Sequence, residues 1–545
     1  MKRPTALIAA LALAVWPSIG LPSSQQPADS SRDVRLVLVI TVDQMRADYL
    51  QRFEDQFSGG FQYLLSRGRV FSEAHQDHAC TETAVGHSTI LSGMLPAHSG
   101  IIGNEWYERG SKQVVYCATA ADGGDAPHGA PVASPRALRA TTLGDWLRDA
   151  QPAAKVISIS RKDRAAIMLG GQHPTGVFWF DPGSGSFRSS SYYGADLPGW
   201  VKTFNATRPA RKYFRSAWDR MLPASAYSRS SPDNQQGEGK LGERNTFPYR
   251  YSGGFRPDSK FYNYLVSTPF LDELTLELAR RGVTSENLGR RRVTDLLAVS
   301  LSSTDSVGHL FGPRSQEIQD LMLRLDRMLG DFFRFLDGRV GLQHVVIVLT
   351  GDHGVAPLPE TPNSDGITER QADKTAVAVR QAEAALVQEL GPGPWIEQQY
   401  GDNLYLNEDT LRRRGLSSAE VEDRLARMLR DSPQVLDAFT RTELVSGQPH
   451  QTPYSSLYAN CFDPQNSGDI VLQPRPDILF REGGGTAHGT PYPYNTHVPL
   501  VIYGSGIPPG VFDTPVRTVD IGPTLAGLLN VSVPPRVDGR DILPK

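Results

Sequence analysis

The sequence has little cysteine, little net charge and few long apolar runs, and each shortage excludes a class of protein. Three cysteines without CxxC spacing exclude a thiolate metal site of that kind. A formal net charge of −3 gives no reason to expect a nucleic-acid partner. Beyond the N-terminus, no run is long and apolar enough to cross a bilayer. The remaining composition fits an ordinary globular protein.

The three cysteines are Cys80, Cys117 and Cys461. Cys80 and Cys117 are the nearer pair in the sequence, although spacing alone does not establish a bridge. The odd number leaves at least one thiol free or paired between chains. Buried free cysteines are the competing interpretation.

The N-terminus has the pattern of a secretory signal. Lys2 and Arg3 precede an apolar run over 6–15, and small and polar residues follow over 17–24. We therefore expect a signal peptide at residues 1–24 and a disordered leader at 25–34, with an N-terminal anchor helix as the alternative. The mature protein would be exported, periplasmic or secreted, with no stable membrane span.

Buried strands alternate with helical patterns along the chain. Expected parallel strands are Leu36–Val42, Lys155–Ser160, Leu296–Leu301, Val345–Thr350 and Val498–Tyr503. Expected helices are Leu143–Ala150, Gln316–Leu336 and Ile521–Leu529. This alternation predicts an α/β fold with a central, mostly parallel sheet sandwiched by helices. Ligands bind such sheets beyond the carboxyl ends of the strands.

Two stretches interrupt the alternation, at about 170–289 and about 359–474. The second contains a strand pattern at Asn403–Leu406 and helical patterns around Ala372–Leu390 and Ser418–Arg430. We interpret both as insertions, a cap and a side subdomain, within one catalytic domain spanning residues 35–545.

Six potential metal ligands lie close to strand ends. They are Asp43, Asp305, His309, Asp352, His353 and His488. Taken singly, each has an ordinary explanation, such as a helix cap or a surface turn. Together they supply mixed oxygen and nitrogen donors, which suit zinc, and their number suits two ions with open positions for water and substrate.

A hydroxyl-rich segment, Cys80–Thr89, precedes an apolar stretch. A threonine that opens a helix would direct its hydroxyl and the first amides of the helix toward an anion such as phosphate. Coordination to a metal would lower the pKa of that hydroxyl. Spacing does not decide between Thr81 and Thr83, and Thr83 could serve only as a helix cap.

Three further residues are candidates for binding phosphate. Asn104 follows a glycine-containing turn and could donate to a phosphate oxygen, unless it only forms an Asx turn. Lys162 and Arg164 follow the strand Lys155–Ser160, where cations can neutralise a phosphate. A solvated basic turn is the commoner interpretation of such a run.

Together these segments resemble the alkaline phosphatase superfamily. More narrowly, they resemble its single-chain bacterial branch with a threonine nucleophile, the PafA-like and Sphingomonas-type alkaline phosphatases. The matching segments keep their order over most of the chain: 42–46, 80–89, 100–104, 162–164, 305–309, 351–354, 487–490, 495–499, 520–525 and 538–540.

The resemblance implies a role for each candidate. Thr83 would be the nucleophile, because it lies four residues before the His of a Gly-His pair, His87. One zinc ion would be bound by Asp305, His309 and His488, and a second by Asp43, Asp352, His353 and the Thr83 oxygen. Asn104, Lys162 and Arg164 would bind phosphoryl oxygens. His497 is not a ligand by this resemblance, and we interpret it either as a residue that supports the ligands from outside or as structural.

The resemblance also limits which reactions of the superfamily we expect. No Cys/Ser-x-Pro-x-Arg sulfatase motif surrounds Thr83, and the segment lacks the Thr-Phe-Pro-Asn-His pattern usual in nucleotide pyrophosphatases and phosphodiesterases. Two added cations should favour monoesters, which carry an extra negative charge. We expect hydrolysis of small phosphorylated substrates of broad range through a phosphothreonine, releasing inorganic phosphate. The alternatives are a phosphodiesterase with the same metals and a non-catalytic, exported zinc- or phosphate-binding protein. The oligomeric state is not predicted.

Overall fold

The computed structural model describes Met1 and residues 33–119, 133–358, 372–476 and 484–544. The chain divides into a unit of residues 1–33 and a compact unit of residues 34–545. All helices and strands named here belong to the second unit. The signal peptide expected at residues 1–24 and most of the expected leader lie outside the described residues.

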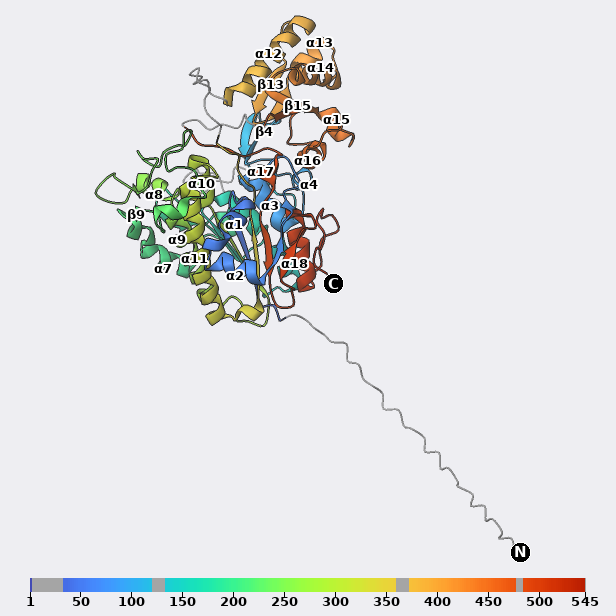
Figure 1. Cartoon of the computed structure of the whole chain (residues 1–545). Helices are drawn as coiled ribbons and strands as arrows, with labels where there is room; N and C mark the ends of the chain where they lie inside the picture. The colour runs from blue at the N-terminus through green and yellow to red at the C-terminus, as the bar shows by residue number, and fades with distance from the viewer. Residues whose placement is uncertain (2–32, 120–132, 359–371, 477–483, 545) are drawn as a thin grey trace. The chain divides into compact units, whose positions relative to one another are not determined.

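Nine strands form the central sheet of this unit (Figure 1). They are β1 (Leu36–Val42), β2 (Arg69–Phe71), β6 (Val156–Ser160), β7 (Gly176–Asp181), β8 (Ser186–Arg188), β11 (Asp295–Leu301), β12 (Val345–Thr350), β17 (Leu500–Tyr503) and β18 (Gly510–Phe512). Their order is β18-β2-β17-β12-β1-β11-β6-β7-β8, and the strands from β12 to β7 run parallel. The expected mostly parallel α/β sheet is confirmed.

Strand β1 shows why the sheet is covered on both faces. Leu36, Leu38 and Ile40 belong to one hydrophobic core, whereas Val37 and Val39 belong to the other. Successive side chains of a strand point to opposite faces, so an unbroken apolar run needs cover on both sides.

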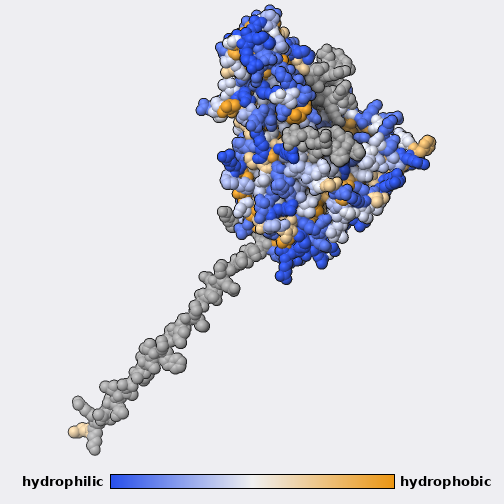
Figure 2. Space-filling model, turned by 180° about the vertical axis from the view of Figure 1, so that it is seen from behind, coloured by the Kyte–Doolittle hydropathy of each residue, from blue (hydrophilic) through white to orange (hydrophobic). Residues whose placement is uncertain are grey.

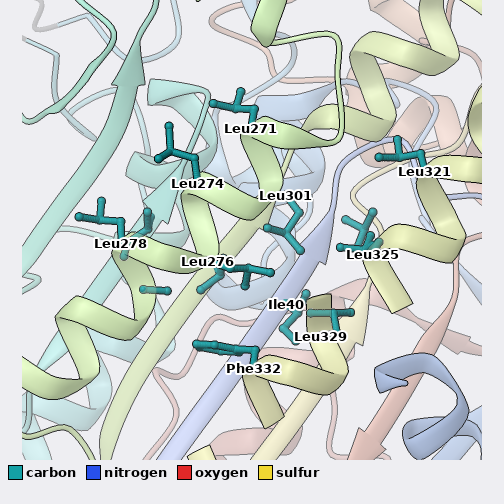
Figure 3. Close-up of a cluster of buried hydrophobic side chains, with 14 of the residues drawn as sticks. Ile40, Leu271, Leu274, Leu276, Leu278, Leu301, Leu321, Leu325, Leu329 and Phe332 are labelled. Carbon is teal, nitrogen blue, oxygen red and sulfur yellow. The ribbon is translucent and has the colours of Figure 1, made fainter. Parts of the chain in front are cut away.

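Helices α2 (Gly60–Arg67), α9 (Phe270–Ser285) and α11 (Gln316–Arg339) contribute to the first core. Figure 3 shows Ile40 and Leu301 of the sheet among Leu276 of α9 and Leu329 and Phe332 of α11. The apolar residues of α11 recur every three or four positions, which places them on one helical face. Helix α11 was expected to end at Leu336 and continues to Arg339.

Helices α3 (Thr83–Ser92), α5 (Leu143–Ala150) and α18 (Ile521–Leu529) contribute to the second core. Helix α5 begins with a capping box, in which the side chains of Thr142 and Asp145 each bind the backbone of the other. The expected bounds of α5 and α18 are confirmed.

The direction expected for the last strand is wrong. Strand β17 begins at Leu500 instead of Val498 and runs antiparallel to β12, with Leu500 opposite Thr350. A short apolar run does not reveal its direction, because both faces are buried either way. The antiparallel direction brings the start of β17 to the edge where β1, β11 and β12 end.

Part of the second interruption forms a separate sheet. Its strands are β13 (Ile396–Tyr400), β14 (Asn403–Leu406), β15 (Val435–Thr440) and β16 (Ile470–Pro474), in the order β13-β14-β16-β15. Helices α12 (Ala372–Leu390) and α14 (Ser418–Arg430) pack with it around a hydrophobic core of their own. The strand pattern and both helical patterns expected here are confirmed.

The first interruption is built differently, because several of its elements belong to the main sheet and its cover. Strands β7 and β8 lie at one end of the nine-stranded sheet, and α9 packs on it. Shorter helices such as α7 (Gly199–Ala206) and α8 (Ser259–Leu265) contribute aromatic residues to the same core.

A disulfide joins Cys80 to Cys461, the last residue of α16 (Ser455–Cys461), with a Cα–Cα distance of 6.0 Å. The pair nearer in sequence, Cys80 and Cys117, is therefore not the bridged pair. Cys117 is free and buried in a cluster with Ala84 and Trp106. Sequence distance was a poor guide, because the fold brings together residues 381 positions apart.

Hydrophilic residues cover most of the face seen in Figure 2. Within the described ranges, no helix combines the length and apolar character that a membrane span needs.

Candidate active site

Six of the candidate ligands form two groups at one edge of the central sheet. Asp305, His309 and His488 make the first group, and Asp43, Asp352 and His353 make the second. Within each group, one ligand atom from every residue lies within 4.8 Å of the others. The grouping agrees with the division between two ions that the family resemblance implies.

The first group depends on a helix and a loop. Asp305 and His309 lie four residues apart on α10 (Ser303–Phe311), so their side chains share one helical face. His488 lies in the loop that leads toward β17. Asp305 Oδ1 is 3.2 Å from His309 Nε2 and 3.7 Å from His488 Nε2.

The second group follows the ends of two adjacent strands. Asp43 comes directly after β1, and Asp352 and His353 come just after β12. His353 Nε2 lies 3.7 Å from Asp43 Oδ1 and 3.4 Å from Asp352 Oδ2. All three side chains are fully buried.

Backbone carbonyls fix the three histidine rings. The Nδ1 atoms of His309, His353 and His488 lie 2.8, 2.9 and 2.8 Å from the carbonyl oxygens of Thr486, Gly354 and Thr81. A proton on Nδ1 that donates to a carbonyl leaves the Nε2 lone pair free. This arrangement is common for metal-binding histidines.

The second group fits a bound cation. Asp43 Oδ1 and His353 Nε2 are buried and have no hydrogen-bond partner in the described structure. Burial, followed by the negative charge of Asp352, raises the pKa of Asp43. A buried carboxylate beside a second carboxylate is costly unless a positive charge compensates it. Mixed nitrogen and oxygen donors suit a divalent transition-metal ion.

The electrostatics keep the other ligands in binding-competent forms. Burial lowers the pKa of His488 well below its ordinary value, and the neighbouring His353 lowers it further, so the ring stays neutral. Burial would raise the pKa of Asp305, but Lys162 and His309 outweigh it and the pKa falls. The pKa of Asp352 is also lowered overall. Burial raises this pKa, but the neighbouring His353 and His87 lower it by more.

Gln44 connects the two groups, and the sequence analysis missed it. Its backbone N–H donates to Asp352 Oδ1 at 2.9 Å, and its side-chain Nε2 donates to Asp305 Oδ1 at 3.0 Å. Its φ of 66° is unusual for a residue other than glycine. The only signal in the sequence was its position directly after Asp43.

Thr83 is the first residue of α3, and Glu82 is the cap that precedes the helix. The expectation that Thr83 could be only a cap is therefore wrong. Its buried Oγ1 accepts a hydrogen bond from Lys162 Nζ at 3.0 Å. The hydroxyl thus lies at the N-terminus of a buried helix, where the helix dipole favours negative charge.

Thr81 is engaged elsewhere. Its hydroxyl donates to the carbonyl of Thr490 at 2.9 Å and accepts from the N–H of Gly489 at 3.2 Å. These bonds give Thr81 a structural role beside His488, whereas the Thr83 hydroxyl contacts a cation. The contacts of the two hydroxyls therefore distinguish Thr83 from Thr81, which the spacing in the sequence did not.

His87 is a second residue whose contacts sequence reasoning missed. Its Nδ1 lies 2.8 Å from the Thr83 carbonyl and 3.0 Å from Asp352 Oδ2, and its Nε2 lies 2.8 Å from Ser300 Oγ. The preceding Gly86 allows this approach, since a Cβ there would lie 2.1 Å from the Asp352 carbonyl oxygen. The Gly-His pair thus brings α3 against the second ligand group.

Lys162 lies among both ligand groups. Its Nζ is 2.7 Å from Asp43 Oδ2 and 2.8 Å from Asp305 Oδ2, in addition to its contact with Thr83. The structure therefore brings the nucleophile candidate, a cation and one carboxylate of each group to one place.

Asn104 and Arg164 lie next to this place. Asn104 Oδ1 accepts from the N–H of Ala84 at 3.0 Å, and its backbone N–H donates to Glu82 Oε2 at 2.8 Å. The amide NH₂ of Asn104 remains as its donor. Arg164 is in the first turn of α6 (Asp163–Gly170), and its buried Nε has no hydrogen-bond partner among the described residues.

Comparisons with known proteins agree with this architecture. The model of the type I phosphodiesterase / nucleotide pyrophosphatase family matches residues 37–498. The alkaline phosphatase PafA of Elizabethkingia meningoseptica is 34% identical over 518 residues, covering 93% of this chain and 94% of PafA. The alkaline phosphatase PhoK of a Sphingomonas species is 33% identical, covering 93% of this chain and 90% of PhoK.

Solved structures give the same likeness. The crystal structure of wild-type PafA superposes with a TM-score of 0.83 at 34% identity, covering 93% of this chain and 98% of that one. Murine ectonucleotide pyrophosphatase / phosphodiesterase 5 reaches a TM-score of 0.52 at 14% identity and covers 92% of this chain and 96% of its own. At that identity, the likeness concerns the fold alone.

Proposed function

Since the chain belongs to the type I phosphodiesterase / nucleotide pyrophosphatase family, within the alkaline phosphatase superfamily, we propose that it is an alkaline phosphatase. It hydrolyses phosphate monoesters of broad range to an alcohol and inorganic phosphate. The names of its relatives support this assignment. The observation that carries it is the position of the Thr83 hydroxyl, 3.0 Å from a lysine that also contacts a carboxylate of each ligand group.

Two zinc ions are the cofactors of this proposal. Asp305, His309 and His488 would hold one ion, and Asp43, Asp352 and His353 would hold the other, together with the Thr83 oxygen as the family resemblance implies. When bound, the ions would supply Lewis-acid chemistry that lowers the pKa of a hydroxyl or water and neutralises charge on the phosphoryl group. The nitrogen-rich first group and the buried, unpartnered donors of the second support zinc.

The first half-reaction takes place on Thr83. Its Oγ1 loses a proton to solvent and attacks phosphorus, the bond from phosphorus to the substrate oxygen breaks, and the leaving oxygen takes a proton from solvent to become an alcohol. The product is a phosphothreonine. Lys162 and the N-terminus of α3 stabilise the negative charge that Oγ1 carries before attack.

The second half-reaction restores the enzyme. A water oxygen attacks phosphorus, the bond to Thr83 Oγ1 breaks, and Thr83 recovers its proton as phosphate leaves. Asn104, Lys162 and Arg164 bind the non-bridging oxygens in both steps. These three residues position the phosphoryl group and neutralise its charge, which is most of what phosphoryl transfer requires of a protein.

The cations favour monoesters over diesters. A monoester carries one more negative charge on its non-bridging oxygens, so interactions with Lys162 and Arg164 are stronger in its transition state. A phosphodiesterase is the competing function, because the family model takes its description from that activity. Turnover of an aryl phosphate monoester and an aryl phosphate diester by zinc-loaded protein decides between them. Faster turnover of the diester would overturn the proposal.

Export is part of the same proposal. The N-terminal pattern of Lys2, Arg3 and a short apolar run is typical of a secretory signal. The bridge between Cys80 and Cys461 gives further support, because disulfides persist mainly in oxidising compartments.

A further inference from the structure

A third cluster of metal-binding side chains lies apart from the two groups described above. It consists of Glu73, His75 and His497, and one ligand atom from each lies within 4.8 Å of the others. Neither the phosphatase reaction nor the family resemblance assigns a role to these three residues together.

Backbone pairing holds the cluster in place. His75 ends β3 (Ala74–His75), which pairs in parallel with β19 (Val516–Arg517). His75 also faces His497 across an isolated antiparallel bridge. Glu73 is two residues before His75, in the bend that leads into β3. The three donors are therefore brought together before any ion binds.

The two imidazoles lie against each other. Their rings stack with centroids 4.5 Å apart and an interplanar angle of 12°. His497 Nε2 lies 2.8 Å from the Ser72 carbonyl, so a proton on Nε2 donates there and leaves the Nδ1 lone pair free.

The carboxylate completes a mixed donor set. His75 Nε2 and Glu73 Oε2 are 3.5 Å apart. The side chains of Glu73 and His75 are 49% and 35% exposed, which gives an ion access and leaves room for His75 to rotate toward it. Two imidazoles and one carboxylate are ligands that zinc accepts, with a position left for water.

We propose that Glu73, His75 and His497 form a third, structural zinc site, separate from the two catalytic ions. The bound ion ties β3 to the segment that enters β17. Gln76, the next residue after His75, donates from its backbone to the Thr496 carbonyl at 2.8 Å and from its side chain to the Gly351 carbonyl at 3.2 Å. Gly351 directly precedes Asp352, so this ion stabilises the backbone that carries a catalytic ligand.

The site is tested by counting zinc ions. Wild-type protein and the variants His75→Ala and Glu73→Gln are equilibrated with zinc at fixed free concentrations. Unbound zinc is then removed, and the number of zinc ions bound per chain is measured. We expect wild-type protein to bind one more ion than His75→Ala. Glu73→Gln should bind that ion at least about tenfold more weakly, since an amide oxygen is a poorer ligand than a carboxylate.

The matched control is His98→Ala. His98 is an exposed histidine whose Nδ1 lies 2.9 Å from an Asp538 oxygen, so it resembles His75 in having one carboxylate neighbour. This variant should bind as much zinc as wild-type protein. The difference in zinc content between wild-type protein and His75→Ala does not depend on whether the catalytic groups hold zinc. A protein without phosphatase activity could therefore still show this difference, so the two proposals can fail separately.

Thermal unfolding gives a second readout. Zinc should raise the Tm of wild-type protein in a further step that is absent in His75→Ala, because ligands of the native state stabilise it. Equal zinc content in wild-type protein, His75→Ala and Glu73→Gln would overturn the proposal. An equal loss in His98→Ala would also overturn it, because it would indicate surface adsorption. If His75→Ala does not fold, Glu73→Gln decides alone, since its exposed side chain is easily replaced.

Discussion

Lys162 Nζ lies 3.0 Å from Thr83 Oγ1. This contact joins the loop between β6 and α6 to the first residue of α3, and the same ammonium reaches Asp43 and Asp305. A lysine in this position stabilises a negatively charged oxygen on Thr83. After the attack, the same ammonium can bind an oxygen of the phosphoryl group. The monoester preference proposed above depends on this lysine and on Arg164.

Removing Lys162 and Arg164 should therefore damage monoester hydrolysis most. For Lys162→Ala combined with Arg164→Ala, kcat/KM for an aryl monoester should fall by about 10²- to 10³-fold or more, the usual loss for one aligned oxyanion donor. The loss for the matching diester should be at least about tenfold smaller, because the diester carries less charge.

Steady-state kinetics on both substrates checks this ratio. Lys155→Ala is the control, because Lys155 lies just before β6 and pairs with Glu286 away from the site. An equal loss on monoester and diester would show that the two cations do not set the specificity.

Removal of metal should abolish activity and lower stability. The carboxylates of Asp43, Asp305 and Asp352 are buried together, and without metal the single ammonium of Lys162 offsets only part of their mutual repulsion. We expect chelated protein to lose activity and to unfold at a lower temperature. Saturating zinc should restore both, with a gain of about 4 kcal/mol at a thousandfold excess over Kd.

Magnesium should not replace zinc, because each group contains histidine nitrogen donors, which suit magnesium poorly. Metal analysis must accompany the assay. Full activity in protein shown to contain less than one metal ion per chain would contradict the two-metal site.

Gln44 should tune metal affinity through its two hydrogen bonds. Gln44→Asn keeps the backbone N–H that binds Asp352, and asparagine tolerates the positive φ of this position. Its shorter side chain does not reach Asp305. Zinc binding at the Asp305 group should therefore weaken by about 10- to 100-fold, the usual effect of losing an outer partner of a ligand.

Competition with a chelator measures the two zinc affinities. Only the affinity of one site should change in Gln44→Asn, and neither should change in Gln62→Asn, whose side chain is exposed on α2. Unchanged affinities in Gln44→Asn would mean that the contact with Asp305 has no effect on the site.

Glu238 should make stability depend on pH. Burial, followed by the charges of Glu317 and Asp233, raises its pKa from 4.5 to about 9. Between these values the native state holds a proton that the unfolded chain releases, so stability falls as pH rises. Glu238→Gln removes this dependence and should raise the Tm at pH 8 by on the order of 1–2 °C.

The difference between wild-type protein and Glu238→Gln should shrink as the pH falls toward 5. Glu243→Gln, an exposed position in the same segment, should show no such trend. A Tm difference that is the same at pH 5 and pH 8 would show that Glu238 is not held in its protonated form.

The ends of the strands could be predicted because the apolar runs that mark them are local features of the sequence. β1 and β12 are unbroken apolar runs with their first and last residues visible in the sequence, and Asp43 and Asp352 follow them closely. Parallel strands end at one edge of a sheet, so ligand candidates at several ends could be expected to meet. The same reasoning could not give the direction of β17, because its short run is apolar throughout.

Long-range pairing was not predictable. The bridge from Cys80 to Cys461 depends on how a distant helix packs against the loop before α3, which no local pattern encodes. Gln44 and His87 act through contacts with Asp305 on α10 and Asp352 after β12, which lie far away in the sequence, and their residue types alone do not distinguish them from surface residues. The choice of Thr83 over Thr81 required either a family resemblance or the hydroxyl contacts themselves.

The most direct test of the account is to trap the covalent intermediate. Zinc-loaded enzyme is mixed with an aryl monoester, quenched in acid within the first turnover, digested and analysed by mass spectrometry. The account predicts phosphate on Thr83 in wild-type protein and in Thr81→Val, and none in Thr83→Ala, which should keep its zinc. Phosphate on another residue, or wild-type turnover by Thr83→Ala, would contradict it.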